Sequence, residues 1–386
     1  MRVLVVNAGS SSLKLSLLAG DARDEVIAAR ELADRVPAAP TGLRRPGRNR
    51  VAPRAQVDRR ELDAALHALG GADAVGHRIV HGGARYRQAV LLDAQVRREL
   101  QALVELAPLH QPRSLAALDA VAQALPQLPA VACFDTAFHA TLPAAAATYA
   151  LPAQWRERWG LRRYGFHGLS HAWVARRAGE LLRGERRSLR IVSCHLGAGA
   201  SLCAIADGRS QDTTMGFTPL EGLVMATRSG SVDPGMLLWL LEDDRVSTVE
   251  LADALEHRSG LLALAGSADM REITRRAGAG EQTATLALEL YTYRLRAGIA
   301  AMAAAIGGVD AVAFTGGIGQ RSPELRADAA AGLDFLGLAI DPELNANGRA
   351  DREVTAAGAR ARTLVIEARE DLEIARQARA VIRAAV

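Results

Sequence analysis

The residues best suited to chemistry lie in glycine-rich turns, the first of them near the amino terminus. The segment NAGSSS, residues 7–12, separates an apolar run from a stretch in which apolar and polar residues alternate. These flanking patterns predict two strands joined by a tight hairpin. On the return strand Ser10, Ser12 and Lys14 share one face, because side chains alternate along a strand. Hydroxyls, backbone N–H groups and an ammonium predict a phosphate cradle, although a plain polar hairpin would carry the same residues.

Two further glycine-rich turns follow apolar strands, HLGAGAS at 195–201 and TGGIG at 315–319. The first of these lies in an apolar hairpin, 190–208, that repeats the plan of the amino terminus. Such a repeat indicates an internal duplication of a nucleotide-binding α/β unit, with a polyphosphate held between two domains. The spacing of TGGIG departs from GxGxxG, which disfavours a dinucleotide-binding fold.

Two arginines and a histidine are candidates for handling an anionic substrate. Arg78 lies in a predicted strand, 73–83, and a guanidinium there is suited to a small carboxylate or a phosphoryl group. Arg228 lies in a turn-rich segment with few apolar anchors, which is typical of a binding site. His167 is expected in a loop just before a helix that Ser170 caps. Structural ion pairs or a structural histidine would also account for these residues.

Carboxylates at the ends of two predicted elements are candidates for orienting a substrate or a metal ion. Asp135 ends a buried strand and could orient a reacting carboxylate, or it could cap the following turn. Glu370 and Asp371 begin the last helix, where they also favour its dipole. Mg²⁺ needs only one or two protein carboxylates, so this pair could hold the ion through water. The chain has no GxSxG nucleophile elbow, which argues against serine hydrolysis.

The elements that would position these residues alternate between strands and helices, which indicates α/β domains with mixed sheets. Helices are expected after Asp93, at 112–125, after Asp233-Pro234, at 281–306, from Ser322-Pro323 and from about 370 onward. Further strands are expected at 130–138, 310–319 and 363–368. The segment 37–60 is rich in Arg, Pro and Gly and is expected to be a solvated surface excursion.

Composition narrows the class of protein. The 386 residues are 49% apolar and 23% charged, which is typical of a soluble globular protein long enough for two domains. A net charge of +4 with 4% aromatic residues argues against a base-stacking nucleic-acid binder. The three cysteines, Cys133, Cys194 and Cys203, form no CxxC pair, so neither a disulfide framework nor a zinc site is expected. No signal sequence or membrane-spanning run is evident, so a cytoplasmic location is expected.

Taken together, these stretches resemble the acetate kinase family, the kinases that form acyl phosphates. The motifs that carry the resemblance run in family order over essentially the whole chain: VLVVNAGSSSLKLSLL, GHRIVHGG, LAPLHQP, FDTAFHATLP, RRYGFHGLSH, HLGAGAS, DTTMGFTPLEGL, TRSGSVDPG and FTGGIG. The resemblance implies a homodimer of an α/β chain with two duplicated actin-like ATPase domains of ribonuclease H-like topology. Their mixed β-sheets are flanked by helices, and the active site lies in the interdomain cleft. The expected domains are 1–139 with 372–386, on the acyl and phosphate side, and 140–371, on the nucleotide side.

The resemblance also implies roles for the residues that match the family's motifs. The implied catalytic residues are Asn7, Arg78, Asp135, His167 and Arg228. Both arginines would neutralise the phosphoryl group in transit, and the histidine would hydrogen-bond it. The implied metal ligands for Mg²⁺, or for Mn²⁺, are Asn7 and Glu370. A small pocket for the acyl group would be formed by Arg78, Val80, Leu109, Phe166 and Pro219. The implied contacts of ATP or ADP are Ser10, Ser12, Lys14, His195, Gly197, Gly199, Asp269, Arg271, Gly317 and Ile318.

Three departures from the family pattern concern the nucleotide and the metal. Ala198 stands where the family usually has Asn, and Gln320-Arg321 stand where it has Glu-Asn. Ala368-Arg369 precede Glu370 in place of the usual Thr-Asn. The residues of the transfer step are intact, so we expect an altered phosphate-donor preference and no loss of activity.

The leading hypothesis is reversible phosphorylation of acetate by ATP, which gives acetyl phosphate and ADP. A propionate kinase is the nearest alternative, because one methylene in an apolar pocket changes binding by only about 1–3 kcal/mol. An actin-like nucleotide switch is an alternative outside enzymes, and a carboxylate-dependent reaction would exclude it. The arginines of 44–60 would also suit a nucleic-acid binder, which salt-sensitive DNA binding would reveal. We expect partners to be a short-chain carboxylate and ATP, with neither nucleic acid nor a membrane among them.

Overall fold

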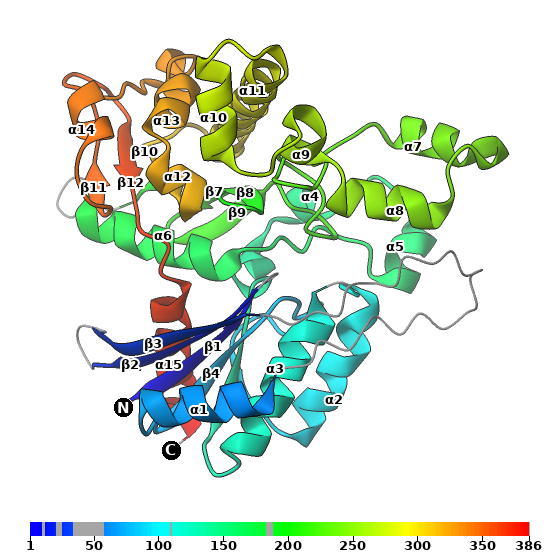
Figure 1. Ribbon diagram of the computed structural model, residues 1–386, viewed down its shortest axis with the longest axis vertical. Helices are drawn as coiled ribbons and strands as arrows, with labels where there is room; N and C mark the ends of the chain where they lie inside the picture. The colour runs from blue at the N-terminus through cyan, green and yellow to red at the C-terminus, as the bar shows by residue number, and fades with distance from the viewer. Residues whose placement is uncertain (10–11, 21–24, 34–57, 109, 183–187, 386) are drawn as a thin grey trace. The chain divides into compact units, whose positions relative to one another are not determined.

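The computed structural model describes residues 1–9, 12–20, 25–33, 58–108, 110–182 and 188–385 (Figure 1). The chain divides into two compact units, Met1–Phe138 with Arg369–Val386, and His139–Ala368. We call them unit 1 and unit 2. Ser10, Leu109 and nearly all of the Arg-rich segment 37–60 lie outside the described residues.

Unit 1 is built on a six-stranded sheet with the strand order β3-β2-β1-β4-β6-β5. Its strands are β1 (Val3–Ala8), β2 (Ser12–Ala19), β3 (Glu25–Ala33), β4 (Ala74–Ile79), β5 (Val90–Leu91) and β6 (Ala130–Phe134). Its described helices are α1 (Arg59–Leu69), α2 (Ala94–Ala102), η1 (Leu103–Glu105), α3 (Gln111–Ala124) and α15 (Glu370–Ala385). The short 3₁₀ helix η2 (Ala137–Thr141) crosses from unit 1 into unit 2.

Unit 2 is built on a second six-stranded sheet with the strand order β11-β12-β10-β7-β8-β9. Its strands are β7 (Arg190–Leu196), β8 (Ala200–Ala206), β9 (Arg209–Thr213), β10 (Ala311–Thr315), β11 (Arg352–Glu353) and β12 (Arg362–Val365). Its described helices in the first half are α4 (Ala144–Ala147), α5 (Ala153–Trp159), α6 (Gly168–Leu181), α7 (Pro234–Leu241), η3 (Glu242–Asp244), α8 (Thr248–His257) and α9 (Gly260–Ala265). Those in the second half are α10 (Met270–Gly278), α11 (Gln282–Ala305), α12 (Gly316–Arg321), α13 (Pro323–Ala330), η4 (Asp334–Leu336) and α14 (Pro342–Ala346).

The two sheets have the same topology. In unit 1, β1 is antiparallel to β2 and parallel to β4, β6 follows in parallel, and β5 closes the edge antiparallel to β6. In unit 2, β7, β8, β10, β12 and β11 repeat these relations in the same chain order. Each sheet also carries an antiparallel third strand with a register shift, β3 against β2 and β9 against β8. The mixed sheets and the internal duplication predicted from the sequence are therefore confirmed.

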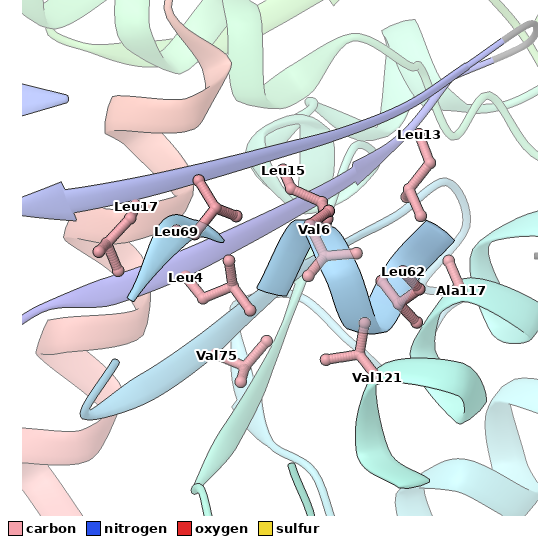
Figure 2. Packing of buried hydrophobic residues seen from close by; sticks show 11 residues of the cluster. Leu4, Val6, Leu13, Leu15, Leu17, Leu62, Leu69, Val75, Ala117 and Val121 are labelled. Atoms are coloured by element: carbon pink, nitrogen blue, oxygen red, sulfur yellow. The ribbon is translucent and has the colours of Figure 1, made fainter. Parts of the chain in front are cut away.

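The core of unit 1 lies between one face of its sheet and the helices α1 and α3 (Figure 2). Leu4 and Val6 of β1 point to this face, because the residues between them point to the other. They meet Leu62 of α1 and Val121 of α3, all at most 2% exposed. Burial of a side chain of this kind stabilises a fold by roughly 1.5–3 kcal/mol. This cluster therefore fixes β1, and with it the position of Asn7 at the end of that strand.

Helix α15 packs against the strands β1, β4 and β6. A Cβ atom built on Gly76 of β4 would lie 2.8 Å from the side chain of Ile374 in this helix. A glycine is thus required for the helix to approach the sheet so closely. The close approach brings the first residue of α15, Glu370, to the end of the sheet where β1 and β4 terminate.

In unit 2, α6 and α11 both pack against the sheet. The cross-strand pairs of β7 and β8 place Ser193, His195, Ser201 and Cys203 on one face, because paired residues share a face and alternate along each strand. This face meets α6, whose His171 bonds Ser193 and Ser201. The other face carries Leu202, against which Gly298 of α11 packs.

Several local predictions are confirmed and one is corrected. Asp93 caps α2 by accepting from the backbone N–H of Val96, and Asp233 caps α7 by accepting from that of Gly235. The segment TGGIG is not a free turn, because Gly316–Arg321 form the short helix α12 directly after β10. Among the described residues, no helix is both long and apolar enough to cross a membrane.

Candidate active site

A cluster of polar side chains lies where the parallel strands of unit 1 end. Asn7 is near the end of β1, Arg78 near the end of β4, and Asp135 directly after β6. The Arg78 guanidinium donates to both oxygens of Asp135, from Nε at 3.0 and 3.1 Å and from Nη2 at 2.6 Å. It also donates from Nη1 to Oδ1 of Asn7 at 3.1 Å, and the Asn7 amide donates to Glu370 at 3.0 Å. The shared edge of the parallel strands and the start of α15 therefore gather four residues that are far apart in the sequence.

The electrostatics of this cluster keep Arg78 charged. Its side chain is 15% exposed and that of Asp135 is 2% exposed. Burial alone lowers the pKa of the guanidinium, but the carboxylates of Asp135 and Glu370 outweigh burial and raise the pKa above its ordinary value. Because three hydrogen bonds hold it against Asp135, the guanidinium has a fixed direction as well as a fixed charge.

Two predicted phosphate contacts of the amino-terminal hairpin, Ser12 and Lys14, are paired with Glu31 of β3. Lys14 is the cross-strand partner of Asn7. Its ammonium nevertheless lies 4.0 Å from Glu31 of the neighbouring strand, and both side chains are more than half exposed. Ser12 donates to the same carboxylate at 2.5 Å. The hairpin itself is confirmed, whereas the phosphate cradle stays a prediction.

In unit 2, the side chains of His167 and Arg228 meet at Gly199. A Cβ atom built on Gly199 would lie 2.9 Å from Nη2 of Arg228 and 3.2 Å from Nε2 of His167. The backbone of His167 has a positive φ of 55°, an uncommon conformation for a residue with a side chain. Burial lowers the pKa of Arg228, and the carboxylate of Glu256 offsets burial only in part. A positive charge with no ion pair and a histidine nitrogen thus flank one glycine in the loop between β7 and β8, within the described part of this unit.

The sequence-based prediction for Ser170 is wrong. Helix α6 begins at Gly168 with His167 as its N-cap, and no side chain caps it. Ser170 is buried in the first turn, where its hydroxyl bonds Nδ1 of His195 at 2.8 Å. The ring of His195 lies 4.4 Å from that of His167, centroid to centroid. The serine therefore holds a histidine at the strand end and does not cap the helix.

The acyl-pocket residues are divided between the two units. Val80 lies in unit 1 and is 9% exposed. Phe166 and Pro219 lie in unit 2, where the Phe166 carbonyl accepts from Nε2 of His139 at 2.9 Å and the Pro219 carbonyl accepts from Arg228 at 2.6 Å. With Leu109 outside the described residues, the acyl pocket stays a prediction.

A cavity of about 680 Å³ lies within unit 2. It gathers five of the predicted nucleotide contacts: Gly197, Asp269, Arg271, Gly317 and Ile318. Asp269 caps α10 and pairs with Arg271 at 2.7 Å. Ala198 and Arg321, two of the departures from the family pattern, line the same cavity. Its size and its mixture of apolar and charged walls suit a nucleoside with an anionic tail.

Sequence reasoning missed a set of buried polar residues beside His167. Ser193, Ser201 and His171 are all 0% exposed, and His139 is 1% exposed. The alternation of Ser193, His195, Ser201 and Cys203 within an otherwise apolar hairpin was the available signal, since polar residues at period two must share a face. Their partners on α6 and η2 are remote in sequence, so only the fold shows the pairs.

Comparison with known proteins places this geometry in a family. Residues 2–376 match the model of the acetokinase family. An acetate kinase of a Synechococcus species is 45% identical over 395 residues, covering 97% of this chain and 98% of that protein. The crystal structure of Porphyromonas gingivalis acetate kinase, 32% identical, aligns over 99% of both chains with a TM-score of 0.85. That of a propionate kinase from Francisella tularensis, 31% identical, aligns over 98% of this chain and 99% of that one, with a TM-score of 0.83. The chain therefore belongs to the acetokinase family and has its duplicated, actin-like ATPase fold.

Proposed function

We propose that this chain is an acetate kinase, which transfers a phosphoryl group reversibly between ATP and acetate. Its membership of the acetokinase family over nearly the whole chain supports this activity. The observation that carries the proposal is the meeting of Arg228 and His167 at Gly199, because it sets a cation beside a hydrogen-bonding nitrogen, and phosphoryl transfer depends on such groups to stabilise charge. Arg78, held by Asp135 and Asn7, is the second cation.

In the proposed reaction, an oxygen of the acetate carboxylate attacks the γ-phosphorus of ATP in line. The bond from that phosphorus to the β–γ bridging oxygen breaks, and ADP leaves with the electron pair. Both reactants are anions, so catalysis consists mainly of positioning and of charge stabilisation. Arg78 and Arg228 supply the positive charge, and His167 donates a hydrogen bond to the moving group. Asp135 acts as a positioning residue through the guanidinium of Arg78.

The residues present suit one magnesium ion shared with nucleotide phosphates. Mg²⁺ is usually held by one or two carboxylates together with water and phosphate oxygens. Asn7 and Glu370 are hydrogen-bonded to each other and offer one carboxylate and one amide oxygen. Among the described residues, no group of three or more His, Cys, Asp or Glu side chains could hold a metal by itself. Bound Mg²⁺, or Mn²⁺ in its place, would neutralise phosphate charge, and Asn7 and Glu370 would hold it.

The departure at Arg369 leaves this role of Glu370 intact. Both guanidinium nitrogens Nε and Nη2 of Arg369 donate to Asp371 at 2.9 Å. The arginine charge is therefore balanced by the neighbouring carboxylate. We accordingly propose that Arg369 does not replace the metal ion.

The cavity of unit 2 is the proposed site of the nucleoside. Gly197 lies in the loop after β7, where a Cβ would be 3.8 Å from Nε2 of the predicted phosphate contact His195, and Gly317 lies at the start of α12. Arg321 lines the same cavity and has no ion pair within the described residues. We propose that Ala198 removes one hydrogen bond to the nucleotide and that Arg321 adds a cation, so that the preference among phosphate donors is changed.

The acyl substrate is proposed to be acetate, with propionate as the alternative. Val80 is small, and one methylene changes binding in an apolar pocket by only about 1–3 kcal/mol. A propionate kinase is among the similar structures, at 31% identity. Further proposals are that units 1 and 2 correspond to the acyl-side and nucleotide-side domains, and that the chain is a cytoplasmic homodimer.

A hydroxamate assay of acyl phosphate formation tests the proposed function. It compares acetate, propionate and butyrate with ATP, GTP and pyrophosphate, each with and without Mg²⁺. Formation of acetyl phosphate from ATP and acetate, dependent on Mg²⁺, is the expected result. If product forms only from a longer acid or from another donor, that acid or donor is the substrate in place of acetate or ATP. No product from a folded protein that binds ATP would overturn the proposal and favour a nucleotide switch.

A further inference from the structure

Three buried side chains of unit 2 and the half-buried His167 form a continuous chain of hydrogen bonds that ends at His167. Ser193 Oγ lies 2.9 Å from Nδ1 of His171, and Nε2 of His171 lies 2.9 Å from Ser201 Oγ. Ser201 Oγ in turn lies 2.9 Å from Nδ1 of His167. We call this set the Ser–His chain. Its first three members are fully buried, so no solvent competes for their hydrogen bonds.

The fold fixes the geometry of the Ser–His chain. Ser193 and Ser201 share one face of the β7–β8 hairpin, on which α6 packs. His171 lies in the first turn of α6, and His167 is the N-cap residue directly before this helix, where its carbonyl accepts from the backbone N–H of His171 at 2.9 Å. One sheet face, the first turn of α6 and its N-cap residue thus hold the four groups.

The number of protons restricts how these groups can bond. A serine hydroxyl has one proton, so Ser201 donates to one of its two histidine partners and accepts from the other. His171 is neutral because burial lowers its pKa well below the ordinary value, so it carries one proton on one nitrogen. If His171 carries it on Nε2, Ser201 accepts there and donates to Nδ1 of His167. If His171 carries it on Nδ1, every bond in the Ser–His chain reverses.

Only the first of these two proton arrangements, with His171 protonated on Nε2, suits phosphoryl transfer. When Nδ1 of His167 accepts from Ser201, the proton of a neutral His167 must be on Nε2. This nitrogen is the one that lies with the Arg228 guanidinium at Gly199. A proton on Nε2 can be donated to a phosphoryl oxygen, whereas a lone pair there would repel it. The nitrogen of His171 that carries the proton therefore determines which nitrogen of a neutral His167 carries its own.

We propose that His171 and Ser201 are positioning residues that hold His167 in the Nε2–H tautomer, ready to donate to the transferring phosphoryl group. The tautomer is a property of the unliganded protein, while its use in transfer rests on the function proposed above. Ser193 completes the set by donating to Nδ1 of His171. Outer hydrogen-bond partners that fix the tautomer of metal-ligating histidines contribute about 10–100-fold to affinity or activity, and we expect an effect of the same size here.

The first experiment reads the tautomer directly in the full-length wild-type protein. The chain has nine histidines, and ¹⁵N-labelled histidine shows separate imidazole signals for the Nδ1–H, Nε2–H and doubly protonated forms. The signal of His167 is assigned by its loss in the variant His167→Gln. At neutral pH we expect His167 and His171 both in the Nε2–H form. An Nδ1–H or a doubly protonated His167 would overturn the proposal.

The second experiment separates positioning from structural support. Ser201→Ala should lower kcat of the hydroxamate assay about 10–100-fold with little change in KM for acetate or ATP, and should mix the tautomers of His167. Ser201→Thr keeps the hydroxyl and should restore most of kcat and the Nε2–H signal. An unchanged kcat in a folded Ser201→Ala variant would contradict the proposal.

Ser210→Ala is the matched control. Ser210 is also fully buried, and its hydroxyl bonds Nδ1 of His139 at 2.8 Å, but it lies outside the Ser–His chain. It should lower thermal stability as Ser201→Ala does and leave kcat unchanged. An equal loss of kcat in both variants would mean that the effect is structural and would overturn the proposal. If the wild type forms no acyl phosphate, the proposed function fails, while the tautomer signal still tests the Ser–His chain.

Discussion

The two sheets of this protein have the same strand order and directions, yet the polar groups that they carry differ in kind. In unit 1 the group is ionic, with Arg78 held against the buried carboxylate of Asp135. In unit 2 it is the Ser–His chain, in which neutral hydroxyl and imidazole groups support His167. The comparison teaches that a shared topology does not determine the kind of polar group that a unit carries, because the residue types decide whether the group offers charge or a directed proton.

The largest expected effect is loss of either arginine. Arg78→Ala and Arg228→Ala should each lower turnover by about 10²–10³, because each removes a charge that stabilises the moving phosphoryl group. Their stabilities should differ. Arg78→Ala leaves Asp135 buried without its partner, which costs about 3–5 kcal/mol. Arg228→Ala removes a hydrogen bond to the Pro219 carbonyl and should cost less. Hydroxamate kinetics and urea unfolding measure the two effects.

The control for both variants is Arg258→Ala. Arg258 pairs with Asp253 at 2.7 Å, but both side chains are about half exposed. It should change neither turnover nor stability appreciably, since exposed ion pairs contribute little. Equal losses of stability in Arg78→Ala and Arg228→Ala would break the contrast between the two units.

Acid should weaken both units through their buried histidines. Burial lowers the pKa of His77 in unit 1 and of His139 in unit 2 to about 4, from 6.5. Below pH 6.5 the unfolded chain therefore binds protons that the folded chain does not. The stability contributed by each histidine is full above pH 6.5 and is lost as pH falls toward 4, by about 1.4 kcal/mol per pH unit. Urea unfolding at a series of pH values measures the slope.

A single substitution sharpens this measurement. His77→Leu should reduce the slope of the free energy of unfolding against pH by the contribution of one histidine, since leucine does not titrate. His67→Leu, at an exposed position of α1, is the matched control and should keep the wild-type slope. An unchanged slope in His77→Leu would mean that the neutral buried state is not the source of acid sensitivity.

Substitutions at two adjacent glycines of unit 2 should distinguish a glycine that the backbone conformation requires from a glycine that contacts the nucleotide. Gly316 has a φ of +79°, and a Cβ there would lie 2.5 Å from the carbonyl of Leu196. Gly316→Ala should therefore destabilise the fold by about 1–3 kcal/mol. Gly317 has open space around its Cβ position and lines the nucleotide cavity. Gly317→Ala should leave thermal stability nearly unchanged and raise KM for ATP severalfold.

The reverse outcome would contradict this assignment. Loss of stability in Gly317→Ala with an unchanged KM would mean that the start of α12 supports the sheet and does not contact the nucleotide. Steady-state kinetics with ATP as the varied substrate, together with thermal unfolding, distinguishes the two outcomes.

The smallest expected effect on stability belongs to the amino-terminal hairpin of unit 1. Lys14 and Glu31 form an exposed ion pair at 4.0 Å, so Lys14→Met should change stability by no more than about 0.5 kcal/mol. If Lys14 contacts phosphate, KM for ATP should rise. Glu31→Gln removes the same ion pair and is the control. A KM that changes equally in both variants would assign the effect to the hairpin and not to the ammonium.

The sequence predicted the fold well because strands and caps are local. The apolar run before Asn7 predicted β1, and Asp93 predicted the start of α2 through a side chain that bonds its own first turn. The repeated hairpins predicted the duplication, since the same local pattern occurs twice. Ser170 shows the limit of this reasoning. A serine near a helix start favours capping locally, but here a histidine of the neighbouring strand binds its hydroxyl.

The residues of the candidate site could be predicted from motifs, but the hydrogen bonds and ion pairs among them could not. Arg78 and Asp135 lie 57 residues apart and Asn7 and Glu370 lie 363 apart, so no local pattern links them. They meet because parallel strands end at the same edge and because α15 returns to that edge. Gly199 was named from its motif, but its closeness to both His167 and Arg228 is likewise visible only in space.

What the sequence alone determined is the set of residue types at strand ends and turns, and through motif order the family. Hydrophobic periodicity and glycine turns suffice for this, because they depend on neighbours in the chain. The tertiary structure decided which of these residues share hydrogen bonds, which carboxylate orients which guanidinium, and which nitrogen of His167 the Ser–His chain supports. Those choices depend on helix-to-sheet packing, which brings remote residues within 3 Å of each other in a buried setting where no water competes for their hydrogen bonds.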